Sequence, residues 1–576
     1  LYQPAVLADG RYEISNAGQL FWFAALVNGD NIHAEFAEQD LSANGVLNAD
    51  IVIPEDMDWT PMAASAVFGN SASTVAATTD KSYSGVFDGA GHKISNLNIR
   101  ANEKELTSGL FGAVTGTIKN LGIESAGFDN GGAYDGRFGA VCGLLVKDSE
   151  TTTEGLVQNC YVVNSSIKTK DKIAGAIVGA NYGGTIANCY ECGNTVEGYN
   201  RIGHLVGDNR NDNSSLSGTV SYCYTDKDRV VGTQGGSEEN SGVKSADEFK
   251  SGEVAVLLQG DQTELAWGQA IGTDEYPVLT TDEAMRVYAA KLYNGSADKV
   301  SELYTNASGI SLPEGNAILV IEGALSASAG TNIVVKNGNA YTCANLVLTD
   351  GADFYTPVTF TAGKATYSRT LPETSTWGTI VLPFEATTTD VSLYEATEII
   401  ADGSEESILA VQPLTGGALE ANTPALFQGE MTGITVTFSA TGVEVAATEN
   451  AVLTKTIGES GYILTGSLST IDALSEGDLF IARDKFWSVG TTNKVGMQAF
   501  RAYIDAPEAG PAQVNALRIL IGDATSIRQT LSDGTLPVDV YSLQGVQLRK
   551  NVECGEALEG LPAGIYIVGG KKVVKK

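Results

Sequence analysis

The chain contains three histidines, and they lie far apart in the sequence: His33, His92 and His204. No His-Glu-x-x-His pattern occurs, which excludes a zinc peptidase that uses that motif. We expect His92 to fix a turn beside Asp88, and His204 to lie outward or partly buried in a strand. The histidines therefore predict no catalytic site, so acid–base chemistry would fall to carboxylates, Lys or Tyr.

Cysteines could bind metal or form disulfides. There are seven of them, an odd number: Cys142, Cys160, Cys189, Cys192, Cys223, Cys343 and Cys554. A chain of 576 residues buries a large core without a disulfide framework. Cys189 and Cys192 form a Cys-x-x-Cys pair, but zinc would need two more ligands at compatible spacing. We expect Cys160, Cys189 and Cys223 to be reduced, metal-free and buried at equivalent positions of a repeat.

Carboxylates could cleave polysaccharides, as they do in many β-helix proteins. Such cleavage needs two carboxylates at a fixed separation, or a Ca²⁺ site with a basic residue. The candidates lie in loops of uneven length: Asp129, Asp135, Asp148 and Asp171. Nothing in their spacing brings them together, so we expect a solvated acidic surface. The sequence thus predicts no catalytic, cofactor-binding or metal-binding residue, and no cofactor.

Aromatic residues near the repeat turns could form a surface that stacks on sugar rings. They are Phe128, Tyr134, Phe138, Tyr182 and Tyr199. The same residues could instead pack each turn onto its neighbour, and the sequence leaves both interpretations open.

Two short patterns alternate along the first part of the chain. One reads apolar, variable, Asn, apolar at residues 94–97, 118–121, 157–160 and 186–189, with a degenerate copy at 220–223. The other places apolar residues between two glycines at residues 109–112, 139–143, 175–179 and 203–207. Each unit holds two short strands that cannot bury their inward face alone. Stacking the units buries one continuous core, which predicts a solenoid.

The predicted solenoid is a right-handed parallel β-helix of five rungs, about 4.8 Å apart. One inward column should contain Ile94, Ile118, Val157, Ile186 and Val220, and a second Leu97, Leu121, Cys160, Cys189 and Cys223. The side-chain amides of Asn96, Asn120, Asn159 and Asn188 should stack at the turns.

The ends of a solenoid need caps. Ser15-Asn16 before residues 20–27 predicts an N-capped amphipathic helix over the first rung. Residues 47–53 are predicted to form the first strand, with Trp59 packed on it. The repeat is expected to stop after Cys223, with a short helix at residues 246–258.

From about Val287 the pattern changes to period-two strands, typical of a β-sandwich. They are expected at residues 317–321, 332–335, 345–348, 379–382 and 434–438. Asn337-Gly338 and Asp350-Gly351 predict turns between them. Residues 538–574 read as two hairpins. The all-β chain is therefore divided into a β-helix domain at 1–285, one or two sandwich domains at 286–530, and a small β domain at 531–576.

The amino-acid composition of the chain limits the classes of partner that it can bind. The chain has 36 Lys and Arg against 69 Asp and Glu, a net charge of −33, which repels nucleic acid and anionic membranes. No apolar run approaches 18 residues, so membrane insertion is not expected.

The first half of the chain resembles the GLUG-motif family. The residues that carry the resemblance are Gly109-Leu110-Phe111-Gly112 with its three echoes, and Phe87-Asp88-Gly89-Ala90-Gly91-His92-Lys93-Ile94-Ser95-Asn96-Leu97. The resemblance covers roughly residues 12–279. Family members are mostly secreted or cell-surface bacterial proteins built around a β-helix, and many are described as adhesins. Some IgA-specific metallopeptidases also carry the repeats, with a zinc motif elsewhere in the chain.

Two later segments resemble modules of bacterial surface proteins. Trp377-Gly378-Thr379-Ile380-Val381-Leu382-Pro383-Phe384 and Ala499-Phe500-Arg501-Ala502-Tyr503 are similar to a β-sandwich module from gut-dwelling Gram-negative bacteria. Val540-Tyr541-Ser542-Leu543-Gln544-Gly545 and Gly564-Ile565-Tyr566-Ile567-Val568 resemble the C-terminal sorting domains of type IX secretion. These resemblances imply a protein that is secreted or held at the outer surface of a Gram-negative cell.

The resemblances, together with the lack of a catalytic motif in the sequence, predict an adhesin-like protein. It is expected to bind an extracellular glycan or host protein and not to be an enzyme. One alternative is a polysaccharide lyase or glycoside hydrolase acting in a β-helix groove. The other is a purely structural stalk. The oligomeric state is not predicted.

Overall fold

The computed structural model describes residues 2–29, 39–64, 81–100, 107–129, 136–147, 153–169, 173–198, 201–209, 218–306, 310–323, 330–401, 406–492, 494–506, 514–533, 537–569 and 571–575. The chain forms two compact units, Leu1–Ala289 with Tyr304–Gly309, and Ala290–Leu303 with Ile310–Lys576. None of the helices in the described ranges has the length and apolar content of a membrane-spanning segment. The division of the chain at residues 285 and 530 stays a prediction.

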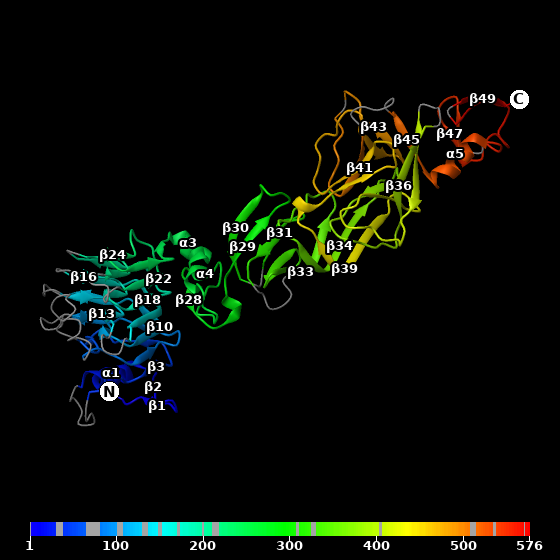
Figure 1. The fold of residues 1–576 in the computed structure, drawn as a ribbon. Helices are drawn as coiled ribbons and strands as arrows, with labels where there is room; N and C mark the ends of the chain where they lie inside the picture. Colours follow the sequence, from blue (N-terminus) through cyan, green and yellow to red (C-terminus); the bar gives the residue numbers. More distant parts are fainter. Residues whose placement is uncertain are drawn as a thin grey trace. The chain divides into compact units, whose positions relative to one another are not determined.

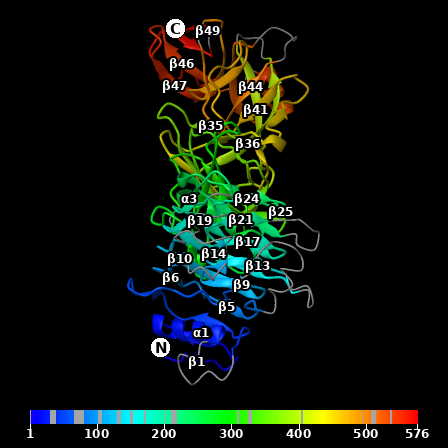
Figure 2. The same cartoon turned by 90° about the vertical axis from the view of Figure 1, so that its left-hand side faces the viewer.

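The first unit is a parallel β-helix, as predicted, and its strands stack in register (Figure 1, Figure 2). Its longest sheet has the order β1 (Ala5–Val6), β2 (Tyr12–Ile14), β3 (Gly45–Leu47), β5 (Val86–Asp88), β10 (Thr117–Glu124), β14 (Leu156–Val163), β18 (Thr185–Ala187), β22 (Thr219–Ser221) and β25 (Ser237–Glu239). The same sheet includes β4 (Ile51–Val52), β6 (Lys93–Ser95), β19 (Tyr190–Cys192), β23 (Tyr224–Thr225) and β26 (Gly242–Val243).

Three further parallel sheets complete the rungs. One contains β7 (Asn98–Arg100), β11 (Gly127–Asp129), β15 (Ser166–Lys168) and β20 (Thr195–Glu197), and a second contains β8 (Thr107–Ser108), β12 (Arg137–Phe138) and β16 (Ile173–Ala174). The third contains the strands of the glycine-flanked motif: β9 (Phe111–Val114), β13 (Cys142–Val146), β17 (Val178–Tyr182), β21 (Val206–Asn209) and β24 (Val231–Gln234).

The predicted inward columns are correct except at their first member. Ile118, Val157, Ile186 and Val220 pair in register and are fully buried. The position predicted for Ile94 is occupied by Phe87, which pairs with Ile118. Ile94 pairs instead with Ile123, so it belongs to the next column. Leu97 is displaced in the same way, since it follows Ile94 at that corner.

The displacement has a conformational cause. Asn120, Asn159 and Asn188 adopt positive φ at one corner of the rung, and Asn96, Ser125 and Asn164 do so at the next corner. Asn tolerates this left-handed conformation better than most residues. At Asn96 the second corner has the same apolar-x-Asn-apolar sequence as the first corner, so the sequence pattern assigned residues 94–97 to the first corner. Of the four asparagines predicted to stack, Asn96 belongs to the second corner.

The solenoid is longer than predicted at both ends. Strands β2 and β3 precede the first recognised repeat, and β24, β25 and β26 extend the helix past Cys223. The last rung is polar: Glu238 pairs with Val220 but is exposed. A terminal rung has no neighbour to cover it, so the apolar pattern disappears where the strand itself persists.

Helix α1 (Ala17–Asn28) lies between β2 and β3 and begins where predicted. The side chain of Asn16 accepts a hydrogen bond from Gln19 N–H, and Gly29 ends the helix at φ 68°. The predicted amphipathic character is wrong, because seven of its twelve residues are buried: Leu20, Trp22, Phe23, Ala24, Ala25, Leu26 and Val27. Phe23 packs on Phe87 with ring centroids 5.8 Å apart. The helix is thus part of the solenoid core.

Residues 245–280 cover one outer face of the solenoid. The single predicted helix is two, α3 (Ala246–Ser251) and α4 (Glu253–Gln259), broken at Gly252 with φ 94°. Phe249, Leu258 and Trp267 pack on Tyr190 and other outward residues of β14, β19 and β23. Trp267 belongs to β27 (Trp267–Gly268), which pairs with β28 (Val278–Leu279).

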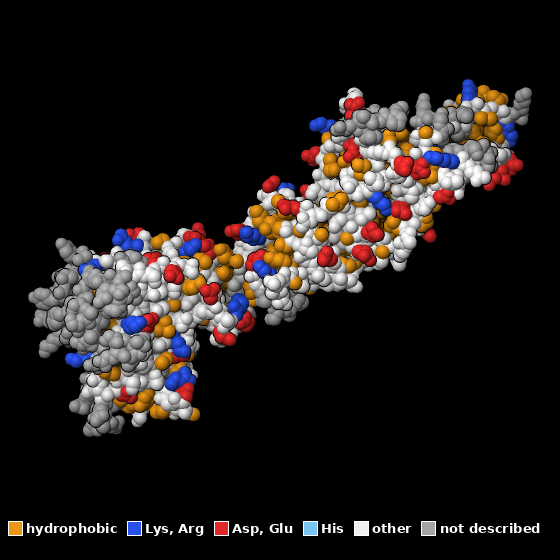
Figure 3. Space-filling view, viewed as in Figure 1, with side chains coloured by type: hydrophobic (Ala, Val, Ile, Leu, Met, Phe, Trp, Pro, Cys, Tyr) orange, Lys and Arg blue, Asp and Glu red, His pale blue; other side chains and the backbone are white. Residues whose placement is uncertain are grey.

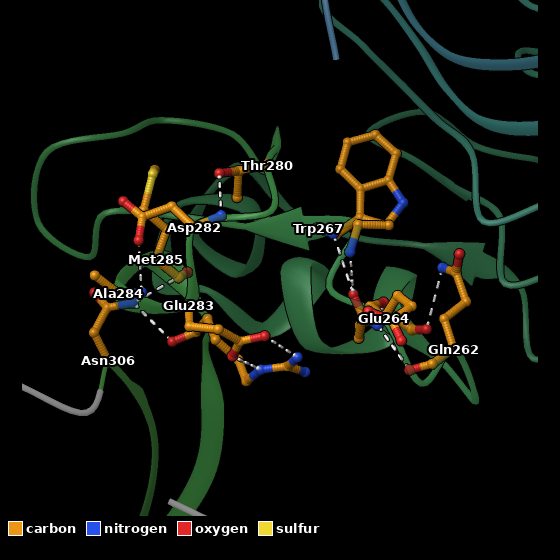
Figure 4. A network of polar contacts seen from close by, with 12 residues as sticks. Gln262, Glu264, Trp267, Thr280, Asp282, Glu283, Ala284, Met285 and Asn306 are labelled. Carbon is orange, nitrogen blue, oxygen red and sulfur yellow. Dashed lines mark hydrogen bonds and ion pairs between the residues drawn. The ribbon is translucent and has the colours of Figure 1, made fainter. Parts of the chain in front are cut away.

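Side-chain amides hold this cover in place (Figure 4). Gln259 Nε2 donates to the carbonyls of Gln262 and Glu264, both at 2.8 Å, and its Oε1 accepts from Trp267 N–H at 3.1 Å. Asn306 Nδ2 donates to the carbonyl of Met285 at 3.3 Å, near the short helix Glu283–Met285. The loops that follow α4 are therefore fixed by hydrogen bonds to their backbone.

The glycines of the second motif allow neighbouring rungs to approach. A Cβ at Gly143 would lie 2.6 Å from the carbonyl oxygen of Arg137, and closer still to the amide nitrogen of Ser108 on the adjacent rung. These backbone atoms are held by the strand pairing and cannot move aside as the end of a flexible side chain can. Only glycine, which has no Cβ, therefore fits at this position of the β-helix.

The second unit begins with a mixed sheet in the order β30 (Val300–Thr305), β29 (Tyr288–Tyr293), β31 (Ile318–Ile321), β32 (Ile333–Asn337), β33 (Ala340–Thr349), β34 (Phe360–Thr370) and β39 (Thr435–Val445). Asn337-Gly338 makes the predicted hairpin between β32 and β33. The turn predicted at Asp350-Gly351 is also present, although the strands on either side of it, β33 and β34, run parallel and form no hairpin.

A second sheet has the order β35 (Trp377–Ile380), β38 (Ala425–Gln428), β36 (Ser392–Ile400), β37 (Ser407–Pro413), β45 (Ala516–Ile521), β43 (Lys485–Ser488), β42 (Leu479–Ala482), β44 (Arg501–Asp505), β41 (Ile463–Ser467) and β40 (Thr454–Thr456). The sheet curls so that β35 meets β44, where Thr379 Oγ1 donates to the carbonyl of Ala502 at 2.8 Å. Helix α5 (Ala524–Asp533) places Ile527 against Ile408 on its outer side.

The two sheets of this unit share one core. It includes Phe360 from the first sheet and Ile380 and Phe427 from the second. The five strands predicted from period-two patterns correspond to β31, β32, β33, β35 and β39. The two C-terminal hairpins are present as β46 (Val538–Ser542) with β47 (Gln547–Val552), and β48 (Gly564–Val568) with β49 (Lys571–Lys575). They join into one sheet through β46 and β48.

Candidate functional site

The histidines lie apart in the structure as well. His92 closes the predicted turn after Asp88, because its backbone N–H donates to the carbonyl of Gly89 at 2.8 Å, and its ring Nδ1 lies 3.1 Å from Asp50 Oδ1. Asp88 accepts from Asn120 Nδ2 at 3.0 Å. His204 is partly buried, which is one of the two positions that the sequence predicted for it. Its Nε2 lies 3.1 Å from Asp228 Oδ1. Burial lowers the pKa of His204. His33 lies outside the described residues.

The cysteines of the repeat form the predicted ladder. Cys160, Cys189 and Cys223 are fully buried, and Cys160 N–H donates to Cys189 Sγ at 3.4 Å. Burial raises the pKa of the Cys189 thiol. Cys192 faces the other way, into the cluster under α3, α4 and Trp267. The two thiols of the Cys-x-x-Cys pair therefore lie on opposite sides of the strand, which does not suit a shared metal ion.

One of the four candidate carboxylates can be placed. Asp129 lies at the end of β11, in register with Lys168 on β15, and Lys168 Nζ is 3.7 Å from Glu197 Oε2 on the next rung. Asp129 therefore belongs to a ladder of alternating charge along the outer face. Asp135, Asp148 and Asp171 lie outside the described residues.

The described aromatic candidates are buried. Phe128 and Phe138 belong to the solenoid core, and Tyr182 is 2% exposed on the outer face of the glycine-motif sheet. For these three residues the interpretation as a sugar-stacking surface is wrong, and the packing alternative is right. Tyr134 and Tyr199 lie outside the described residues.

Tyr182 is part of a buried charged cluster that the sequence did not reveal. Its hydroxyl donates to Asp208 Oδ2 at 3.3 Å, and Arg201 reaches the same oxygen at 2.9 Å. The Arg137 guanidinium lies 5.5 Å from the centre of the Tyr182 ring. Burial raises the pKa of Tyr182. Asp208 and Arg137 are buried, the arrangement of a structural ion cluster whose members come from three successive rungs.

Glu191 is a second unexpected charge, inside the solenoid. It pairs in register with Val162, whose side chain points into the core. Its carboxyl accepts hydrogen bonds from Thr225 Oγ1 and, at 2.7 Å, from Asn194 Nδ2. Burial raises the pKa of Glu191 to about 7. The sequence carried a signal, because Glu191 lies two residues after the inward Cys189 and so shares its side of the strand.

A concave surface lies among the described residues of the second unit. Two adjoining hollows of about 450 and 360 Å³ share Glu385 and Val443. Small residues on both walls, Ala421, Ala440 and Gly442, leave the space open. Acidic side chains are scattered over the region of β34 and β39 in Figure 3. We call this surface the Asn422 hollow.

Polar groups line the Asn422 hollow. Glu385 and Glu444 are exposed at its rim. Asn422 has φ 57°, and its backbone N–H donates to the carbonyl of Leu382 at 2.7 Å, which fixes the residue in place. Its side-chain oxygen is buried and has no hydrogen-bond partner in the described part of the chain. Buried acceptors are nearly always paired in native proteins, so this oxygen is an exception among the described residues.

Comparison with known proteins gives little further guidance. No protein-family model matches the chain. No curated protein matches it either. One solved structure, a putative immunoglobulin A1 protease from Bacteroides ovatus, is similar at 18% identity with a TM-score of 0.31. That similarity covers 49% of this chain and 95% of the other. The resemblance to the GLUG-motif family therefore rests on the motif residues and on the turns where they lie.

Proposed function

We propose that this chain is an adhesin-like binding protein, secreted or held at the outer surface of a Gram-negative bacterium, that recognises an extracellular glycan or host protein without catalysis. The observation that carries the proposal is the hollow itself, whose rim presents the exposed carboxylates of Glu385 and Glu444.

The chemistry of the rim indicates the kind of ligand. Glu385 and Glu444 are acceptors, so they favour a ligand rich in hydroxyl or ammonium donors. The net charge of −33 opposes sulfated polymers and nucleic acid. A neutral or cationic sugar, or a basic segment of a host protein, therefore suits the hollow best.

The test is binding of the full chain to an array of glycans and host-matrix proteins. Asn422→Ala and Glu385→Gln should each weaken the strongest interaction about tenfold, because each removes an acceptor from the hollow. Glu314→Gln, which changes an exposed carboxylate outside the hollow, should leave it unchanged. Unchanged binding by both hollow variants would assign the ligand to another surface.

The same experiment separates the alternatives. Failure to bind any member of the array would favour the structural stalk. Product release from a polysaccharide or protein, abolished by one Asp→Asn change within residues 97–213, would establish the enzyme instead.

A further inference from the structure

Strand β39 forms one edge of the seven-stranded sheet of the second unit, beside β34 (Figure 1). A strand at the edge of a sheet has backbone N–H and C=O groups that no neighbouring strand pairs. Such groups can bind an extended chain, which then adds a strand to the sheet. The part of this edge that the chain itself leaves uncovered is therefore a place where a partner can pair.

The chain covers the middle of the outer edge. Ser439 exchanges two backbone hydrogen bonds with Thr387, each 3.0 Å long, and Thr437 N–H donates to Asp390 Oδ2 at 2.8 Å. The backbone groups of a strand alternate between its two edges, so those of Thr441 point the same way as those of Ser439 and Thr437. In the described part of the chain, no group bonds to Thr441 on that outer edge.

The pairing with the outer edge stops before Thr441. Continued in the same register, it would place Glu385 opposite Thr441, but no such bridge forms. Ala386 pairs instead with Leu419, by backbone hydrogen bonds of 2.9 and 2.8 Å. This pairing directs the segment away from β39 and leaves the outer edge at Thr441 open.

The Asn422 hollow lies along this open edge. Its larger part is lined by Gly442 and Val443 of β39, and its smaller part by Thr441. A Cβ at Gly442 would have no atom within 4 Å, so the space beside the strand is open. The hollow is therefore a slot beside β39, and an added strand would lie about 4.8 Å from it.

Two carboxylates without partners flank the slot. Glu385 and Glu444 are exposed, and neither has an ion pair or hydrogen bond within the described ranges. Lys364 lines the smaller part only, in register with Thr441. A lysine or arginine of a bound segment therefore belongs in the larger part, near the two carboxylates, and an uncharged residue belongs beside Lys364.

We propose that the Asn422 hollow binds an extended, basic segment of a partner protein by adding it as a strand to β39. This proposal rests on the proposed function, because it names the ligand class of the same hollow. A sugar could also bond to the carboxylates, but an extended backbone is the ligand that pairs with both the N–H and the C=O of Thr441. The net charge of −33 makes a second copy of this chain a poor occupant.

Calorimetric titration of the full chain with short blocked peptides tests the proposal. The probe is acetyl-Lys-Val-Lys-Val-Lys-amide, and the comparison peptide has Glu in place of each Lys. The basic peptide should bind at least ten times more tightly than the acidic one, and added salt should weaken its binding.

Backbone pairing is tested by two further peptides, which carry N-methyl groups either on the valines or on the lysines. Alternate N–H groups of a strand point to opposite edges, so one of these peptides should lose at least tenfold in affinity and the other much less. Amide hydrogen exchange of the parent protein should also slow at Thr441 when the basic peptide is bound.

Thr441→Pro removes the N–H from the open edge and should weaken binding of the basic peptide at least tenfold. Thr435→Pro is the matched control, because Thr435 lies on the same edge of β39, is exposed, and is outside the hollow. Glu444→Gln should weaken binding about threefold and reduce its salt dependence. Lys364→Gln should not weaken it.

Four results would each overturn the proposal: no binding of the basic peptide at millimolar concentration, equal binding of the acidic peptide, equal affinity of both N-methylated peptides and the parent peptide, or unchanged affinity in Thr441→Pro. If Glu385→Gln weakens binding of a glycan or host protein from the array while no basic peptide binds, the hollow keeps its proposed function and strand addition is excluded. Failure of the inference is thus distinguishable from failure of the proposed function.

Discussion

At the scale of single residues, the first unit carries a carboxyl where the preceding rungs carry aliphatic side chains and the following rung carries Thr225. Glu191 occupies the column of Ile94, Ile123 and Val162. Burying an ionised carboxylate costs far more than burying a neutral one, so the folded state favours the protonated form. The hydrogen bonds from Thr225 and Asn194 offset only part of that cost.

The stability of the first unit should therefore depend on pH. Because burial raises the pKa of Glu191 from 4.5 to about 7, its stabilising contribution is complete below pH 4.5 and is lost as the pH rises through 7. Glu191→Gln should match the parent near pH 4 and exceed its unfolding free energy by about 3 kcal/mol near pH 9. Thermal unfolding at both pH values measures this. Glu239→Gln, at an exposed position, is the control.

Thiol reactivity should divide the seven cysteines into two classes. Cys554 is exposed, whereas the other six are buried. Burial raises the pKa of Cys189, and that of Cys343 to about 11, which leaves little thiolate at neutral pH. A thiol-reactive dye should therefore label one cysteine per native chain and seven after denaturation. Rapid labelling of several native thiols would show that the ladder opens readily.

At the scale of elements, the glycine-flanked motif marks where one short strand turns into the next and meets the rung beside it. Gly143→Ala should destabilise the first unit by about 3 kcal/mol or more, because its methyl group would meet backbone atoms of Arg137 and Ser108. Gly242→Ala is the matched control, since a methyl group at this position on β26 would have no atom within 4 Å. If both variants lowered the unfolding temperature equally, the close approach of neighbouring rungs would not explain the glycine-flanked motif.

At the scale of the whole molecule, the two units should unfold in separable transitions, because each has its own core. Val157→Asp buries a charge without a partner in the first unit and should cost several kcal/mol. Calorimetry should show its first-unit transition at lower temperature and the other transition unchanged. Gln158→Asp, on the neighbouring half-buried position, should shift the first transition much less. A common shift of both transitions would mean that the units unfold together.

The sequence by itself determined the repeat, the parallel β-helix, the cap at Asn16, five strands of the two larger sheets of the second unit and the two C-terminal hairpins. Those features depend on local rules: inward apolar columns, asparagines that tolerate positive φ, and glycines where a Cβ does not fit. Such rules fail where two corners look alike, as at Ile94, and where the last rung is polar. Only the tertiary structure placed Asp208 beside Tyr182 and Glu191 inside the core. It alone formed the Asn422 hollow, because its residues come from segments far apart in the sequence that meet only in the folded unit.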